Sequence, residues 1–255
     1  MSVDYGPVSP WATARMLVRL AWARTFSPLL VAGVSGLLLL PVVFALVFAS
    51  RGSLSGDPAV FLVQRYDTLV CALATPLIAL LLGTSAFSAE TEDGTLLYLV
   101  TTTTPRWWIA GVRVAYASLL TGVLSAAAVW FTGAIAAANS DPEQVTSGFA
   151  VGVLFGGIAY AALFTALALL TRRALVAGLV YVLFWEGVLT TTFPALHYLS
   201  VRQWMLAVAS EISESTDSRL LAVPSLTAAL IGAALLVVLA VYVGGRRLQR
   251  PRMAR

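Results

Sequence analysis

The feature that most restricts the fold of this chain is a series of six long apolar runs, separated by shorter polar connections. Each run is near or above the roughly 20 residues that an α-helix needs to cross about 30 Å of hydrocarbon. None shows the alternation of apolar and polar residues that marks the strands of a membrane β-barrel. The sequence therefore predicts an all-α membrane protein with six transmembrane helices, at about 28–49, 69–88, 109–138, 148–170, 174–195 and 226–243.

Composition indicates that these runs form one membrane domain. Of the 255 residues, 59% are hydrophobic and only 11% are charged, whereas roughly 25% are charged in soluble domains. We expect a cytosolic or interfacial segment over 1–27, a transmembrane domain over 28–243 and a basic cytosolic tail over 244–255. The first run is too long for the apolar region of a signal peptide, so we expect it to remain as a span.

The side chains missing from the sequence exclude several kinds of site. All sixteen basic residues are arginines, so the chain lacks the lysine with which a P-loop ATPase holds the phosphates of ATP. A single cysteine, Cys71, excludes an internal disulfide and a cysteine metal cluster. One histidine without cysteine or acid at ligand spacing does not make a metal site. We therefore expect no ATPase site, no bound cofactor and no metal in this chain.

The distribution of the arginines predicts the orientation in the membrane. Twelve of the sixteen precede the first span, flank the second-to-third or fourth-to-fifth connection, or follow the sixth span. By the positive-inside rule, both termini are then cytoplasmic in a multi-pass protein of the plasma or inner membrane. Because the arginines gather at span ends and form no continuous patch, membrane lipid and not nucleic acid is the expected partner. The other four are Arg51, Arg65, Arg202 and Arg219.

The residues before the first span predict a helix. Ser9 suits its N-cap and Pro10 its first helical position, and the helix would run to about Phe26. Its tryptophans and arginines suit the membrane surface, which favours an N-terminal interfacial helix. The arginines do not gather on one side of this helix, however, so a simple cytosolic extension is the alternative.

The connection between the second and third spans holds the most informative pattern. Glu90, Glu92 and Asp93 stand at the predicted C-terminal end of a helix, where the macrodipole disfavours negative charge. Gly94 can end that helix and Thr95 can cap a new one, whose N-terminus then favours the same acids. The pattern therefore predicts a second, short helix directly after the second span.

This short helix is apolar but cannot cross a membrane. It comprises Leu96, Leu97, Tyr98, Leu99 and Val100, on the side that the arginines identify as cytosolic. A transverse helix inserted into a groove of a soluble subunit would bury the leucines and place the acids at the rim of the groove. The alternative is a polar connection whose leucines lie in the membrane interface.

The run FSAETEDGTLLYLVTTTTPRWWIAGVRV, over 87–114, resembles the loop between the second and third spans of ABC-2 type transporter permeases. In that family an acidic end of the second span, a Gly-Thr pair, a leucine-rich stretch, a proline and a basic residue recur in this order. The resemblance implies that Glu90 and Glu92 lie at the cytosolic end of the second span. It also implies that 94–100 is a coupling helix that docks on an ATPase subunit.

The resemblance extends over essentially the whole chain, since six spans with a longer segment between the fifth and sixth are similar to the family's arrangement. It implies that Pro105 and Arg106 start the third span, and that the chain is the permease subunit of an ATP-driven exporter of lipophilic or amphipathic molecules. ATP and magnesium would bind to a separate P-loop ATPase subunit, and the second permease would be another copy or a sibling. The departures from the family pattern are the four threonines before Pro105 and Arg113, where relatives often have lysine.

Two other functions remain as alternatives. A membrane scaffold or sensor would tether an ATPase without transporting a molecule. An intramembrane enzyme is more remote, because it needs convergent polar groups and only Glu186 stands near the middle of a span. Ser35, between glycines in the first span, would have to form a dyad with His197, but small-residue packing and an interfacial histidine explain both.

Glu186 and a row of glycines carry further hypotheses. An ionisable group within a span is costly, so Glu186 would contact the transported molecule, exchange a proton, clamp two helices or pack in a protonated, hydrogen-bonded form. Gly148, Gly152 and Gly156 recur at a four-residue spacing that allows close helix packing, within the subunit or across a dimer.

The outer connection 197–225 contains a predicted helix over 200–212. Its apolar residues recur at helical spacing, which predicts that one face of this helix lies against the bilayer or against the bundle. Pro194 precedes this helix in the chain and Pro224 follows it.

Overall fold

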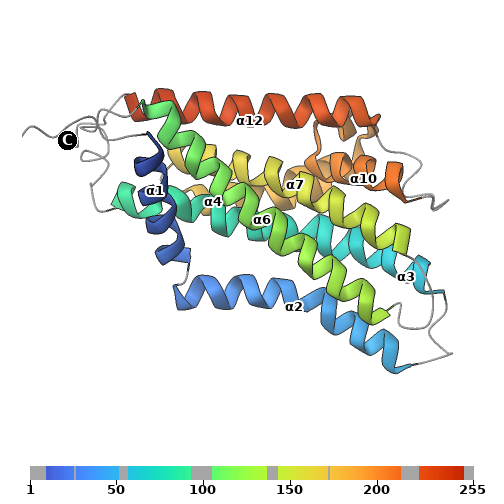
Figure 1. Ribbon diagram of the computed structural model, residues 1–255. Helices are drawn as coiled ribbons and strands as arrows, with labels where there is room; N and C mark the ends of the chain where they lie inside the picture. Colours follow the sequence, from blue (N-terminus) through green and yellow to red (C-terminus); the bar gives the residue numbers. More distant parts are fainter. Residues whose placement is uncertain are drawn as a thin grey trace, which may run out of the picture.

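The computed structural model describes residues 10–25, 27–51, 57–92, 105–136, 143–171, 173–213 and 224–249, and every secondary-structure element within these ranges is helical. Six helical segments are long and apolar enough to cross a membrane, and they run alongside one another in a bundle (Figure 1). The prediction of an all-α, multi-pass membrane protein with six spans is therefore confirmed. In chain order the elements are α1 (Pro10–Thr25), α2 (Pro28–Ser50), α3 (Pro58–Arg65), η2 (Tyr66–Ala74), α4 (Thr75–Glu92), α6 (Arg106–Ala136), α7 (Glu143–Leu170), α8 (Ala174–Val180), η3 (Tyr181–Leu189), α9 (Thr190–Thr192), η4 (Pro194–Leu199), α10 (Val201–Ile212) and α12 (Leu226–Gln249).

The second span is longer than the sequence predicts. Its helix begins at Pro58, not near Leu69, and runs without a break through α3, η2 and α4. The Oδ1 of Asp57 accepts the N–H of Ala59 at 2.9 Å, and proline follows the cap, as at many helix starts. The apolar pattern misses these turns because Asp67 and other polar residues interrupt it.

Two of the six spans contain a π-helical stretch. In the second span it is η2, which includes Asp67, and in the fifth span it is η3, which includes Glu186. Such wide turns are rare inside helices and occur often at functional sites. Each of the two stretches therefore carries one acidic residue into the bundle.

Helix α7 lies at the centre of the bundle, and α4, α6, α10 and α12 all pack against it. Where α7 crosses α6, a Cβ added to Gly157 would lie 2.8 Å from the Cα of Gly122, so the two backbones are in contact. Helices α2 and α12 lie on opposite sides of the bundle in Figure 1. They bury only 17% of their most apolar windows, against 61% for α7, as expected of helices that face lipid.

Two shorter helices lie at opposite ends of the bundle (Figure 1). At one end α1 runs across the spans, where Leu17 is buried against Ile109 and the ring of Trp11 meets Trp108 edge to face at 5.8 Å. At the other end, a 3₁₀ turn leads the chain from the fifth span back into the bundle as α10. Helix α10 is buried on most of its circumference, so more than the single face predicted from its spacing is covered.

Candidate functional site

The glycine ridge of α7, which comprises Gly148, Gly152 and Gly156, forms the seat of α10. A Cβ added to Gly148 would lie 2.8 Å from the carbonyl oxygen of Ala209, and one added to Gly152 would lie 2.5 Å from that of Met205. At Gly156 it would overlap the side chain of Met205. The ridge thus packs within the subunit, against the backbone of α10.

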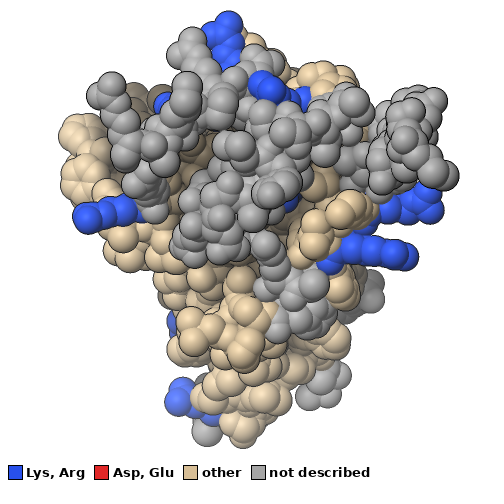
Figure 2. All heavy atoms as spheres, turned by 90° about the vertical axis from the view of Figure 1, so that its left-hand side faces the viewer, with Lys and Arg blue, Asp and Glu red and all other residues tan. Residues whose placement is uncertain are grey.

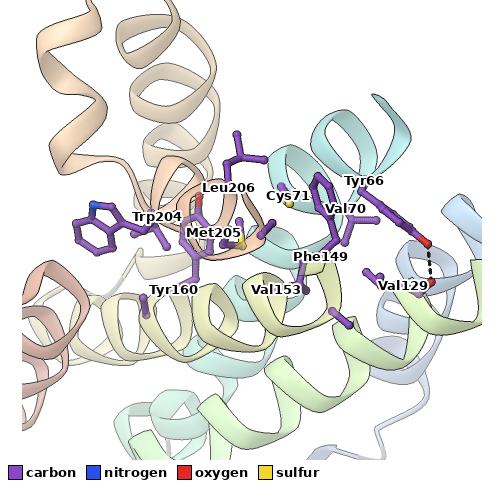
Figure 3. Close-up of a cluster of buried hydrophobic side chains, with 14 of the residues drawn as sticks. Tyr66, Val70, Cys71, Val129, Phe149, Val153, Tyr160, Trp204, Met205 and Leu206 are labelled. Atoms are coloured by element: carbon purple, nitrogen blue, oxygen red, sulfur yellow. Dashed lines mark hydrogen bonds between the residues drawn. The ribbon is translucent and has the colours of Figure 1, made fainter. Parts of the chain in front are cut away.

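The side chains around this seat are large and tightly packed. Met205 and Tyr160 are fully buried, and Figure 3 shows the side chains of α10 among those of α7 and η2. On the side of α10 that faces α12, a Cβ added to Gly232 would lie 2.6 Å from the indole of Trp204. The Nε1–H of Trp204 donates to the carbonyl oxygen of Tyr198 at 3.0 Å, which fixes the turn before α10.

Glu186 binds the start of α10. Its side chain is 2% exposed, and its Oε2 accepts the hydroxyl of Ser200 at 2.5 Å. Its Oε1 accepts the N–H of Val201 at 3.0 Å and the hydroxyl of Tyr181 at 3.2 Å. These hydrogen bonds tie the fifth span to the N-terminus of α10, which is the end of a helix that favours negative charge. The contacts of Glu186 are those of a clamp between two helices.

Asp67 binds α10 from the other side. Its Oδ1 accepts the Nη2–H of Arg202 at 2.7 Å and the Nε–H at 3.0 Å. The side chains of Arg202 and Asp67 are only 16% and 9% exposed. Burial opposes the charge on Arg202, but the Asp67 carboxylate outweighs burial and raises the pKa of the guanidinium above its ordinary value. Arg202 therefore stays charged, and the pair holds α10 against the second span.

Together these groups form one structure, which we call the carboxylate clamp: Asp67 with Arg202, and Glu186 with Ser200 and Val201. The sequence singled out Glu186 and the helix over 200–212, but not the partnership of Asp67 and Arg202. In the sequence, Arg202 stands out only as one of the four outer arginines. The sequence does contain a usable signal. Asp67 and Arg202 carry opposite charges on the same predicted side of the membrane, and Asp67 lies next to an apolar run.

The predicted ATPase-coupling loop lies mostly outside the described residues. Glu90 and Glu92 belong to the last turns of α4, and α6 begins at Arg106, directly after Pro105. The predicted coupling helix and its cap lie outside the described ranges, and with them Asp93, Gly94, Thr95, Leu96, Leu97 and Leu99. Beside this loop, the buried Arg113 of α6 donates from Nη1 to the carbonyl oxygen of Ala86, which joins the second span to the third.

The remaining candidates do not form a catalytic or metal site in the described part of the chain. Ser35 lies in α2 and His197 in η4, and no hydrogen bond joins these two described residues. Among the described residues, no group of three histidine, cysteine or acidic side chains is placed to hold a metal. In comparisons with known proteins, no family model and no curated protein matches the chain.

Proposed function

We propose that this chain is the permease subunit of an ABC-2 type exporter, driven by a P-loop ATPase on a separate subunit. One observation carries the proposal: a single unbroken helix, Pro58–Glu92, joins the carboxylate clamp to the start of the loop 90–106. Along an ideal helix, Asp67 and Glu92 are about 38 Å apart, which is enough to cross the membrane. A permease needs such a connection between its motor and its translocation path.

At the inner end, the ATPase subunit would dock on the coupling helix at Leu96, Leu97 and Leu99, and the neighbouring acids would line the rim of its groove. The bond from Arg113 to Ala86 supports joint movement of the second and third spans. At the outer end, α10 would close the path between two permease copies. Movement of the second span would then act on α10 through Asp67 and Arg202.

The charge distribution supports an orientation with both termini in the cytoplasm. Figure 2 looks onto the end of the bundle where α1 lies and α12 terminates, and its coloured residues include several arginines. Buried ionisable groups also favour transport over tethering, because they are costly in a membrane and usually mark moving or conducting parts.

The proposal is tested by reconstituting the chain with its cognate ATPase in liposomes. Leu96→Asp combined with Leu97→Asp should abolish both co-purification and the stimulation of ATP hydrolysis. The matched control, Thr102→Asp with Thr103→Asp, adds the same charge to the same loop and should retain the complex. Unchanged complex formation by the leucine variant would sink the docking model. A stable complex whose ATPase activity no candidate cargo stimulates, and which moves none of them, would favour the scaffold.

A further inference from the structure

A cavity of about 300 Å³ lies at the end of the bundle where α12 terminates, opposite the end that holds α10 (Figure 1). It is formed by the last residue of α7 and the final turns of α12. The described residues that line it are Leu170, Tyr242, Val243, Arg246 and Arg247. None of these described residues belongs to the clamp, and the function proposed above assigns them no role.

Two guanidinium groups line this cavity. The guanidinium carbon of Arg246 lies 5.0 Å from the centroid of the Tyr242 ring, so a cation–π contact holds it against the wall. Arg247 follows directly and is also exposed. Among the described residues, no carboxylate forms an ion pair with either arginine. Guanidinium groups present planar arrays of N–H donors, which match the oxygens of a phosphate.

The other walls of the cavity are apolar and open outward. Leu170 is 40% exposed and Tyr242 is 54% exposed. Both stand where the apolar part of a span gives way to arginines, which is the depth of lipid headgroups in a bilayer. A ligand at this site therefore meets positive charge on one side and hydrocarbon on the other.

We infer that this cavity binds an anionic phospholipid. Its phosphate lies between Arg246 and Arg247, and its glycerol and first acyl carbons lie against Leu170, Tyr242 and Val243. Basic pockets between membrane helices are suited to such headgroups. A free phosphate ion would use the two arginines but would gain nothing from the apolar walls.

The packing of α12 against α6 next to this cavity indicates what a bound lipid would stabilise. On another side of α12, a Cβ added to Gly244 would lie 2.9 Å from the Cβ of Ala110, and one added to Gly245 would lie 3.3 Å from that of Trp107. The end of α12 is thus held against the start of α6. A lipid in the cavity would brace the ends of α7, α12 and α6 together.

The experiment measures binding of phosphatidylglycerol and phosphatidylcholine to the purified full chain by native mass spectrometry. Arg246→Gln with Arg247→Gln should weaken phosphatidylglycerol binding by about thirtyfold, the effect of two arginines near an anionic lipid surface. The matched control, Arg15→Gln with Arg19→Gln in α1, removes the same charge from exposed positions at the same end and should retain binding. Tyr242→Ala, which keeps both charges, should also weaken phosphatidylglycerol binding.

Three outcomes would overturn the inference. Equal loss in the α1 control would show general attraction between charged surfaces. Equal binding of phosphatidylcholine would show that the headgroup charge is not recognised. Displacement of phosphatidylglycerol by inorganic phosphate, with full binding retained in Tyr242→Ala, would identify a soluble phosphate site instead. All substituted side chains are exposed, so monodisperse elution of every variant is expected and checks that the fold is intact.

Discussion

The two ends of the second span differ in how their polar groups are satisfied. At the α10 end, Asp67 pairs with Arg202 inside the same chain, and Glu186 nearby has three hydrogen-bond donors from the protein. At the other end, Glu90 and Glu92 lead into an apolar stretch that we propose to be covered by another subunit. The α10 end therefore holds the subunit together, whereas we propose that the other end attaches a partner. Substitutions at the α10 end should therefore lower the stability of the chain, whereas substitutions at the other end should weaken complex formation.

The largest effect on stability is expected at Arg202. Arg202→Met removes the guanidinium that binds the buried Asp67 carboxylate, and breaking such a buried pair typically costs about 3–5 kcal/mol in the free energy of unfolding. The double variant Asp67→Leu/Arg202→Met leaves no charge behind and should lose less than Arg202→Met alone. Unfolding in mixed micelles with increasing SDS measures the loss of stability in both variants. A double variant that loses as much stability as Arg202→Met, or more, would break the comparison, because the two residues would then not act as a pair.

The glycine ridge should give the next largest effect. Gly152→Ala places a methyl group 2.5 Å from the carbonyl oxygen of Met205, and such overpacking costs about 1–3 kcal/mol. Gly36→Ala in α2 is the matched control, since nothing lies within 4 Å of its added Cβ. The same SDS titration should show a loss for the first variant and none for the second. Equal stability of both would mean that α10 does not rest on the ridge.

Glu186→Gln should have a smaller effect. The amide keeps an acceptor for Val201 but replaces the oxygen that accepts the hydroxyl of Ser200 with an N–H donor, so a loss of about 1 kcal/mol is expected. Complex formation with the ATPase should be unaffected, whereas cargo-stimulated turnover should change. If stability, turnover and efflux all equal those of the parent chain, Glu186 serves neither as a clamp nor in transport.

The smallest effect on stability is expected in the loop. Leu96→Asp with Leu97→Asp should alter the free energy of unfolding of the isolated chain by no more than about 0.5 kcal/mol, as for surface substitutions. The same variant should lose its ATPase subunit. A drop in stability comparable with that of Arg202→Met would show that these leucines pack within their own bundle, and the contrast between the two ends would disappear.

The spans could be predicted from the sequence because their signal is local. A run of about 20 apolar residues identifies a membrane helix without knowledge of its neighbours. The start of the second span at Pro58 was missed for the same reason, since Asp67 lowers the local apolarity and is compensated by Arg202, which is far away in the chain. Ion pairs of this kind depend on the arrangement of the helices, which periodicity does not specify.

The candidate site was predicted in parts. The sequence identified Glu186, the three glycines and the helix over 200–212 as separate features. Their convergence on one another required the fold, because α7, η3 and α10 meet only through tertiary packing. The coupling helix over 94–100 stays a prediction.

The glycine ridge also has a consequence for movement. Because Gly148, Gly152 and Gly156 carry no side chains, the surface of α7 that α10 contacts is smooth and repeats every four residues, or about 6 Å. Translation of α10 by one repeat would meet a similar surface at nearly the same separation of the helix axes. The ridge alone therefore does not set the register of α10 along α7; the hydrogen bonds of Asp67 and Glu186 and the packing of Trp204 against Gly232 do so.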